Sequence, residues 1–222
     1  MEWVDGTDAG RLIDLVGALG TEIPLKHVLY IVREALQGLH HAHTATGADG
    51  LPLGIVHRDI SPGNLLISRQ GAVKLADFGV ALGKTGRRRA DPGQVAGKPQ
   101  YHAPELFDGA PASVQTDLFA MGVSCYELLS SRRLFDPRLD RRQLADTMRG
   151  FSPRELLDRD LTVPDGLEPV LLRALDPYPR DRYQAALEFL EDINDFAYES
   201  GIRLLDAHFA SFVGRLLREA PA

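Results

Sequence analysis

The sequence predicts a mainly α-helical domain that contains one small β-hairpin, an α+β fold class. Apolar residues recur at helical spacing along most of the 222 residues. Two short apolar runs, "LLIS" at 65–68 and "AVKLA" at 72–76, are separated only by the turn-forming string "RQG". With 44% hydrophobic residues, the chain is long enough to bury one well-packed core.

Most of the chain is expected to be helical, and one long stretch is not. The apolar spacing predicts helices over 9–19, 25–45, 114–131, 139–149, 167–176, 183–198 and 202–219. Pro24 suits the first turn of the second helix, and the turn-rich string "TGADGLPLG" at 46–54 ends it. Residues 80–100 are rich in Gly, Pro and Arg, so we expect a long loop there. Long loops inside compact domains are usually functional or disordered.

Composition and charge exclude several classes of function. The 31 acidic residues outnumber the 25 basic ones, so the net charge of −6 does not support a general nucleic-acid or anionic-membrane surface. Cys125 is the only cysteine, which excludes an internal disulfide and fits a reducing compartment such as the cytoplasm. It lies in an apolar run, so we expect a small buried side chain rather than a reactive thiol. No apolar stretch reaches the length of a bilayer-spanning helix, and the N-terminus does not resemble a secretory signal.

The string "HRDISPGNLL" at 57–66 concentrates polar side chains just before a buried strand. Asp59 and Asn64 flank the tight "SPG" turn, which allows their side chains to point the same way. Carboxylate and amide oxygens are hard ligands that suit Mg²⁺. The predicted hairpin returns the chain toward its start, so Asp77, directly after the second strand, can approach Asn64. These residues predict a metal–phosphate site.

Three strings in order now carry a family resemblance. "HRDISPGNLL", "KLADFGVA" at 74–81 and "YHAPE" at 101–105 resemble the catalytic loop, metal-binding motif and P+1 segment of protein kinases. The resemblance is to the large C-terminal lobe of a bacterial serine/threonine protein kinase. It implies that Asp59 is the catalytic aspartate and that Asn64 and Asp77 hold the Mg²⁺ ions that bridge the phosphates of ATP. It also implies that Phe78 packs inward.

Other residues match positions that hold the shape of this fold. "TDLFAMGVSCYELLSSRRLF" at 116–135 resembles the central buried helix of the family, whose Asp117 would brace the backbone of the catalytic loop. "DPYPRDRYQAALEFL" at 176–190 resembles the late segment whose Arg182 would pair with Glu105. His57 is expected to be a packed scaffold residue. Arg58 is a candidate partner for a phosphate on the activation segment.

The first residues resemble the hinge of the family, here 1–8, followed by the first helix of the large lobe. The resemblance implies that Glu2 and Val4 face adenine through backbone groups and that Leu66 forms an apolar floor beneath the base. Asp8 has two possible roles, contact with the ribose hydroxyls or the N-cap of the helix. The resemblance places the catalytic loop at 57–64, the activation segment at 77–105 and a helix packed on the lobe at 199–222.

The resemblance also has a gap at its start. In the family, a small β-rich lobe precedes the hinge and carries a Gly-rich loop, a phosphate-binding lysine and its partner glutamate. Residues 1–222 correspond to the large lobe only, which a late-called gene start, a truncated gene or a fragment would each explain. Because catalysis in this fold depends on positioning and charge stabilisation of ATP, we expect weak or no activity from residues 1–222 alone.

Two positions depart from the chemistry of the family. Serine/threonine kinases usually carry a lysine two residues after the catalytic aspartate, where this chain has Ser61. They usually carry a threonine after the glycine that begins the P+1 segment, where this chain has Lys98. These positions approach each other in the family, so we expect Lys98 to supply the ammonium that Ser61 cannot. The alternative is a solvated loop lysine.

Three further patterns have structural or open interpretations. Thr85, beside "RRR" at 87–89, is either a phosphorylation site that orders the loop or part of a simply basic, mobile loop. "HHAH" at 40–43 is not expected to bind metal, because no Cys or acidic residues cluster near it. The C-terminal apolar side chains share one side of an amphipathic helix that we expect to pack on the domain. They are Ile202, Leu205, Phe209, Phe212 and Leu216.

The sequence therefore favours a serine/threonine protein kinase lobe that uses ATP and Mg²⁺ to phosphorylate a protein substrate, without nucleic acid or a membrane segment. Tyrosine specificity stays open, because Ser61 breaks the usual serine/threonine marker. A second interpretation is a non-catalytic docking or regulatory module that keeps the fold without the turnover. A third is a small-molecule phosphotransferase, which "YHAPE" and the expected pair of Glu105 with Arg182 disfavour.

Overall fold

A computed structural model describes residues 3–78, 97–154 and 163–219. Expectations for Glu2, for Thr85 and for the arginines at 87–89 lie outside the described residues, as does most of the loop predicted over 80–100.

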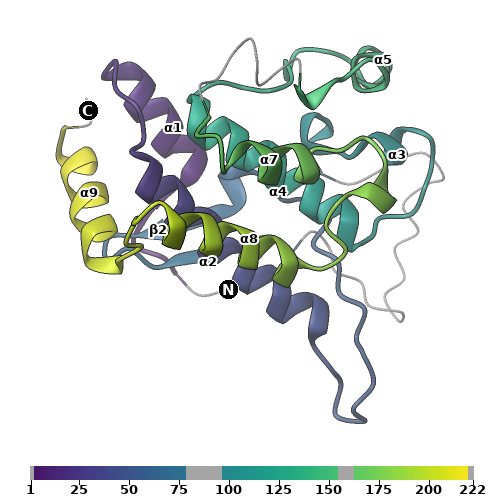
Figure 1. Ribbon diagram of the computed structural model, residues 1–222, viewed down its shortest axis with the longest axis horizontal. Coiled ribbons are helices and arrows are strands. Elements are labelled where there is room, and N and C mark those ends of the chain that lie inside the picture. Colours follow the sequence, from purple (N-terminus) through teal and green to yellow (C-terminus); the bar gives the residue numbers. More distant parts are fainter. Residues whose placement is uncertain (1–2, 79–96, 155–162, 220–222) are drawn as a thin grey trace.

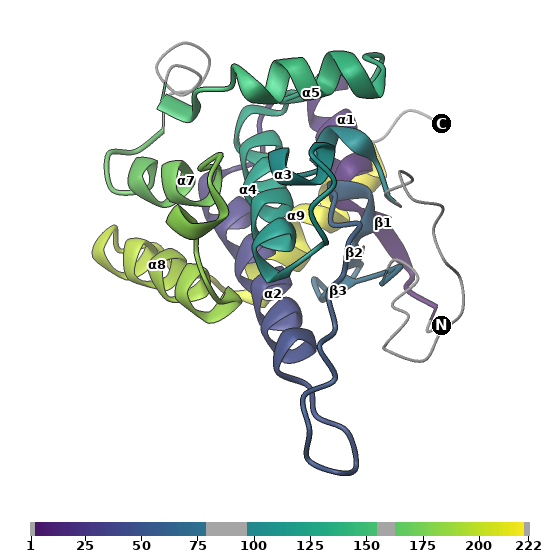
Figure 2. The same ribbon diagram turned by 90° about the vertical axis from the view of Figure 1, so that its right-hand side faces the viewer.

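Two helices form the centre of the domain. They are α2 (Leu25–Thr44) and α4 (Val114–Ser130), which contact each other. Figure 2 shows α7 (Glu168–Ala174) and α8 (Ala186–Glu199) on one side of this pair and the strands on the other. Both central helices are buried along most of their length because side chains from these flanking layers meet on them. The predicted mainly helical architecture is confirmed.

A three-stranded antiparallel sheet covers the other side of α2. Its order is β1 (Gly6–Asp8), β2 (Leu65–Ser68) and β3 (Val73–Leu75). β2 and β3 form the predicted hairpin, with Leu65 paired to Leu75. β1 is an addition to the prediction and lies within the segment expected to be a hinge. Its three residues, "GTD", have no apolar alternation, and a Cβ at Gly6 would overlap the carbonyl oxygen of Ile67.

Among the described residues, four further helices surround this centre (Figure 1). They are α1 (Ala9–Ala18), α3 (Pro104–Phe107), α5 (Arg141–Arg149) and α9 (Asp206–Glu219). Predicted helix ends shift by a few residues where a cap decides them. Helix α5 begins at Arg141, two residues later than predicted, because Asp140 is its N-cap. The Asp140 carboxylate accepts a hydrogen bond from the Gln143 N–H at 2.9 Å. Within the described residues, no helix is both long and apolar enough to cross a membrane.

Cys125 lies in the middle of α4 and is fully buried, as its apolar surroundings predict. Burial raises the pKa of its thiol to about 12, because the interior disfavours the charged thiolate. At neutral pH the thiol is therefore protonated and unreactive.

The C-terminal helix packs on the domain through most of the predicted side. Phe209, Phe212 and Leu216 are buried, and Ile202 packs at the edge of the core. Leu205 is 43% exposed, so its assignment to the buried side is wrong. The reason is that α9 begins only at Asp206, so Leu205 does not follow the helical spacing.

Candidate active site

Asp59 and Asn64 lie side by side across a tight turn. Pro62–Asn64 form a 3-10 turn that is closed by a hydrogen bond from the Asn64 N–H to the Ser61 carbonyl oxygen (2.9 Å). The Asn64 Nδ2 donates to the backbone oxygen of Asp59 at 2.6 Å and to its carboxylate Oδ2 at 2.9 Å. The bend therefore brings the two side chains together, and the amide holds one carboxylate oxygen in place.

Lys98 reaches the same turn from a distant part of the chain. Its backbone N–H donates to Asp59 Oδ1 at 3.2 Å, and its Nζ donates to the Ser61 hydroxyl at 2.8 Å. Ser61 is fully buried, whereas Lys98 is exposed. The hydrogen bond to Ser61 therefore holds the Lys98 ammonium against the loop. Gly97 permits this approach: its φ is +102°, and a Cβ there would lie 2.9 Å from Asp59 Oδ1.

Asp77 lies one residue beyond the backbone partner of Asn64. The Ala76 N–H donates to the Asn64 carbonyl oxygen at 2.9 Å, which extends the β2–β3 pairing by one step. Asp77 has a φ of +51° and is exposed, so the chain turns out of the strand at this point. Phe78 was expected to pack inward. Its ring contacts that of His57, with centroids 4.4 Å apart, but it remains 36% exposed, so this expectation is only partly met.

Asp117 braces the backbone at the start of the 57–64 loop, as predicted. Its two carboxylate oxygens accept hydrogen bonds from the N–H groups of His57 (2.7 Å) and Arg58 (2.8 Å). Arg58 has a φ of +69°, a conformation that an arginine seldom adopts without such support. His43, from the "HHAH" string, also bonds the Asp117 carboxylate at 2.9 Å through Nε2. That histidine therefore belongs to the scaffold of the loop.

His57 is completely buried and acts as the expected scaffold residue. Its Nε2 lies 3.1 Å from the Ala76 carbonyl oxygen, which joins the loop to the end of β3. Burial lowers the pKa of His57 against the opposing effect of Asp117, so the ring is uncharged at neutral pH. The ring thus links the residues on either side of the hairpin without adding a charge.

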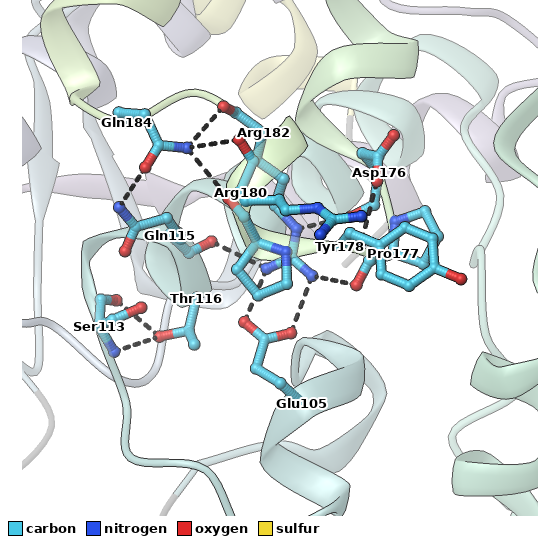
Figure 3. Close-up of polar contacts among 11 residues, drawn as sticks. Glu105, Ser113, Gln115, Thr116, Asp176, Pro177, Tyr178, Arg180, Arg182 and Gln184 are labelled. Carbon is cyan, nitrogen blue, oxygen red and sulfur yellow. Dashed lines mark hydrogen bonds and ion pairs between the residues drawn. The ribbon is translucent and has the colours of Figure 1, made fainter.

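Figure 3 shows the predicted pair of Arg182 and Glu105. The guanidinium of Arg182 donates from Nη1 and Nη2 to the two carboxylate oxygens of Glu105, each at 2.8 Å. Further bonds run to the backbone oxygens of Asp176, Gln115 and Pro177 at 2.5, 3.3 and 2.9 Å. Arg182 is almost fully buried, and these bonds use its donors. The pair fixes the end of the "YHAPE" segment to the segment between α7 and α8.

One buried network was not anticipated from the sequence. Glu127 on α4 accepts hydrogen bonds from the Tyr101 hydroxyl at 2.8 Å and from Arg133 Nη1 at 2.7 Å. Burial raises the pKa of Glu127, and the bonds from Tyr101 and Arg133 oppose this shift. A glutamate inside the apolar run "SCYELL" with an arginine six residues later was the available signal. The network holds Tyr101, the first residue of the "YHAPE" string, on α4.

A family model described as the protein kinase domain matches residues 1–194 of this chain. The chain belongs to the protein kinase family. Its similar bacterial relatives include the tyrosine-protein kinase MasK of Myxococcus xanthus, 39% identical over 200 residues that cover 90% of this chain and 31% of the relative. The serine/threonine-protein kinase PknB of Mycolicibacterium smegmatis is 32% identical over 202 residues, which cover 87% of this chain and 29% of the relative.

A probable PknB of Lactococcus lactis is 29% identical over 195 residues, which cover 87% of this chain and 29% of that relative. The chain thus spans about a third of the length of the curated relatives that it matches. By family it is a protein kinase, and the contacts of Asp117 and of Arg182 with Glu105 hold the corresponding segments of this kinase lobe together.

Two of the residues expected to face a nucleotide, Asp8 and Leu66, lie on β1 and β2, and Val4 precedes β1. Asp8 pairs directly with Leu66 across the two strands, and both are half-buried, as is Val4. Asp8 also caps α1, because its Oδ1 accepts a hydrogen bond from the Arg11 N–H at 2.9 Å. The N-cap role is therefore present, and it leaves the proposed contact with ribose untested. Glu2 lies outside the described residues.

A groove opens beside Lys98. Its volume is about 500 Å³, and Gly63 and Tyr101 line it together with residues from the start of α1. Arg11 and Asp14 bring opposite charges to this rim, and Arg133 joins them at 3.9 Å from the Asp14 carboxylate. The groove leads to the turn that holds Asp59, because Lys98 borders both.

Asn64 and Asp77, the residues expected to hold magnesium, offer a small set of oxygen donors. Asn64 uses Nδ2 for its two bonds to Asp59, and no hydrogen bond among the described residues involves its Oδ1. Asp77 is exposed with its carboxylate accessible. Within the described residues, no group of three His, Cys, Asp or Glu side chains could enclose a metal. Mg²⁺ typically binds through one or two carboxylates plus phosphate oxygens and water, so this donor set fits it.

Proposed function

We propose that this chain contributes the catalytic lobe for transfer of the γ-phosphoryl group of ATP to a hydroxyl group of a protein. Asp59 would accept or orient the proton of that hydroxyl. The observation that carries this proposal is the restraint on its carboxylate, which Asn64 holds at Oδ2 and the Lys98 backbone holds at Oδ1. A carboxylate held from both sides meets the positioning that phosphoryl transfer demands.

Bound Mg²⁺ would neutralise the developing charge on the phosphates, and Asn64 and Asp77 are its proposed ligands. Glu2, Val4, Asp8 and Leu66 are the proposed contacts of ATP. The pairing of Asp8 with Leu66 supports this assignment, since it places a carboxylate and an apolar side chain opposite each other on adjacent strands.

Lys98 is proposed to provide the ammonium that most serine/threonine kinases carry at the position of Ser61. The distance of 2.8 Å between Lys98 Nζ and Ser61 Oγ supports this exchange, because a cation held there lies beside the turn that carries Asp59. An ammonium near a transferring phosphoryl group stabilises the charge that spreads over its oxygens.

The proposed acceptor is a serine or threonine hydroxyl, in the cytoplasm. Names of relatives differ on this point: PknB is called a serine/threonine kinase and MasK a tyrosine kinase. Phosphoamino-acid analysis of a modified substrate separates the two cases. Phosphotyrosine alone would replace the serine/threonine assignment with the alternative that Ser61 leaves open.

The test uses two forms of the protein, the 222-residue chain and the same chain joined behind the small lobe of the Myxococcus xanthus relative. Each is assayed for Mg²⁺-dependent binding of ATP and for phosphate transfer to a generic protein. We expect Asp59→Asn to reduce turnover in the active form by at least about a thousandfold while ATP still binds, since charge and proton acceptance are lost without a change in shape.

Asp49→Asn is the matched control, because Asp49 is an exposed carboxylate on the 46–52 loop and should leave turnover unchanged. A folded Asp59→Asn variant that binds ATP and turns over as fast as the unaltered protein would contradict the proposed role. A folded protein that neither binds ATP nor transfers phosphate in either form would favour the docking-module interpretation.

A further inference from the structure

A cavity with a basic lining lies away from the proposed active site. It is open to solvent and has a volume of about 800 Å³ between the start of α2, the β2–β3 turn and α9. Figure 1 shows α9 at the edge of the domain. Most of its polar lining is basic, and no carboxylate from the described part of the chain contributes to it. The basic residues are Lys26, His27, Arg69, His208, Arg215 and Arg218.

The walls of this cavity are held in fixed positions. Gly71 in the β2–β3 turn has a φ of +85°, and a Cβ there would lie 3.0 Å from the Ala210 backbone nitrogen and the Asp206 carbonyl oxygen. The turn therefore rests directly on the backbone of α9. On the other side, the His27 ring stacks on Phe212, with centroids 4.5 Å apart and planes 19° apart. The basic side chains of three separate elements thus converge on one space.

The positive charge of the cavity is poorly compensated. Among the described residues, Lys26, Arg215 and Arg218 form no ion pair, and Arg69 pairs only with the exposed Asp5 at 3.2 Å. Burial, together with the positive charges of Lys26, His208 and Arg215, lowers the pKa of His27 to about 4. In a chain whose net charge is −6, this local excess of cations is unusual.

We propose that this cavity binds a small polyanion that carries two or more phosphate groups. Its volume lies in the range of small-molecule sites. Four lysine and arginine side chains exceed what a single phosphate needs, and guanidinium groups bind phosphate oxygens in pairs. Because no carboxylate lines the cavity, the ligand would bind without a bridging Mg²⁺ ion. Asp5 beside Arg69 and Glu22 in the groove next to Arg215 limit the basic area, which disfavours a long nucleic acid.

The test is calorimetric titration of the whole chain with inorganic tripolyphosphate in EDTA, so that no magnesium–phosphate complex forms at the proposed active site. We expect the double variant Arg215→Glu/Arg218→Glu to weaken binding at least about tenfold, since each removed charge-assisted contact is replaced by repulsion. Arg132→Glu/Arg142→Glu is the matched control. It makes the same change in net charge at exposed positions elsewhere and should alter binding less than about twofold.

Three further measurements complete the test. Single inorganic phosphate should bind at least about tenfold more weakly than tripolyphosphate, because it engages fewer cations. Bound tripolyphosphate should raise the pKa of His27, followed by NMR, because it offsets the charges of Lys26, His208 and Arg215 that lower it. Vesicles containing phosphatidylserine are the last probe.

Equal loss of tripolyphosphate binding in both double variants would overturn the proposal, as would no loss in either. Binding to the vesicles but not to tripolyphosphate would also overturn it in favour of a membrane surface. Since the assay requires neither Mg²⁺ nor Asp59, its outcome is independent of the proposed phosphoryl transfer. Asp59→Asn should bind tripolyphosphate like the unaltered chain.

Discussion

At the scale of single residues, the contact between Lys98 and Ser61 is the most informative feature of the lobe. The two residues are 37 positions apart, yet the Lys98 ammonium donates to the Ser61 hydroxyl at 2.8 Å. Resemblance to the family led us to expect that Lys98 would approach Ser61. The alternative was a freely solvated lysine, but the Lys98 ammonium is hydrogen-bonded to Ser61. The Lys98 ammonium is therefore held at Ser61, in the turn between Asp59 and Asn64, although its sequence position is unusual.

Lys98→Ala should lower turnover by about a hundredfold in whichever form of the protein is active, with a smaller effect on the affinity for ATP. The reason is that an ammonium that stabilises the transferring phosphoryl group acts chiefly in the transition state. Measured kcat and KM for ATP check this expectation.

The decisive companion variant is Lys98→Ala/Ser61→Lys, which moves the ammonium to the position that the family usually uses. We expect it to recover at least about tenfold of the lost turnover. Arg142→Ala, an exposed cation on α5, is the control and should have no effect. Near-normal turnover of Lys98→Ala alone would end the proposed exchange.

At the scale of elements, the lobe depends on the close approach of α4 and α7. Gly122 on α4 faces Ala174 at the end of α7, and a Cβ built on Gly122 would lie 2.9 Å from the Ala174 Cβ. That separation is too short for two carbon atoms, so only glycine permits the present packing. The helical pattern of the sequence predicts both helices but does not show how near they lie.

Gly122→Ala should destabilise the domain by about 1–2 kcal/mol, because overpacking outweighs the gain in helix propensity of about 1 kcal/mol. Urea unfolding followed by circular dichroism measures the change. Ala174→Gly removes the opposing methyl group, so its cost should be smaller in the Gly122→Ala background than in the unaltered chain.

Gly17 on α1 provides the matched control. A Cβ at Gly17 would contact nothing within 4 Å, so Gly17→Ala should stabilise the domain by up to about 1 kcal/mol through helix propensity alone. Equal effects of the two glycine substitutions would show that propensity, rather than the contact of α4 with α7, decides the outcome.

At the scale of the whole molecule, the pair of Arg182 and Glu105 joins segments 77 positions apart (Figure 3). The arginine is buried with the carboxylate and three backbone oxygens around it. When a buried charge loses its partner, water cannot take the partner's place, and the folded state is destabilised. The pair therefore ties Glu105, at the end of the "YHAPE" segment, to the segment between α7 and α8 that carries Arg182.

Arg182→Met should lower the free energy of unfolding by about 3–5 kcal/mol, because it leaves the Glu105 carboxylate and several backbone oxygens unpaired. Adding Glu105→Met in that background should cost less than Glu105→Met alone, which a double-mutant cycle in urea measures. The exposed pair of Arg149 and Asp146 is the control, and Arg149→Met should change stability by no more than about 0.5 kcal/mol. Additive effects of Arg182→Met and Glu105→Met would contradict direct coupling.

Sequence reasoning predicted the helices and the hairpin well, since each rests on local spacing of apolar residues. It missed β1, because "GTD" becomes a strand only where β2 offers its edge. It also missed the network of Glu127, Tyr101 and Arg133, whose members come from separate segments. Leu205 was misplaced because α9 begins at Asp206, four residues later than the predicted start at 202, so Leu205 lies outside the helix.

By itself, the sequence determined the family, the mainly helical class and the residues proposed to handle phosphate and magnesium, because each is written in short contiguous strings. Only the tertiary structure decided that Asn64 and Lys98 restrain opposite oxygens of Asp59, and that basic side chains from α2, α9 and a turn surround one cavity. The physical reason is that such contacts form between segments far apart along the chain. Their distances depend on how the whole core packs, and no local pattern of residues encodes that.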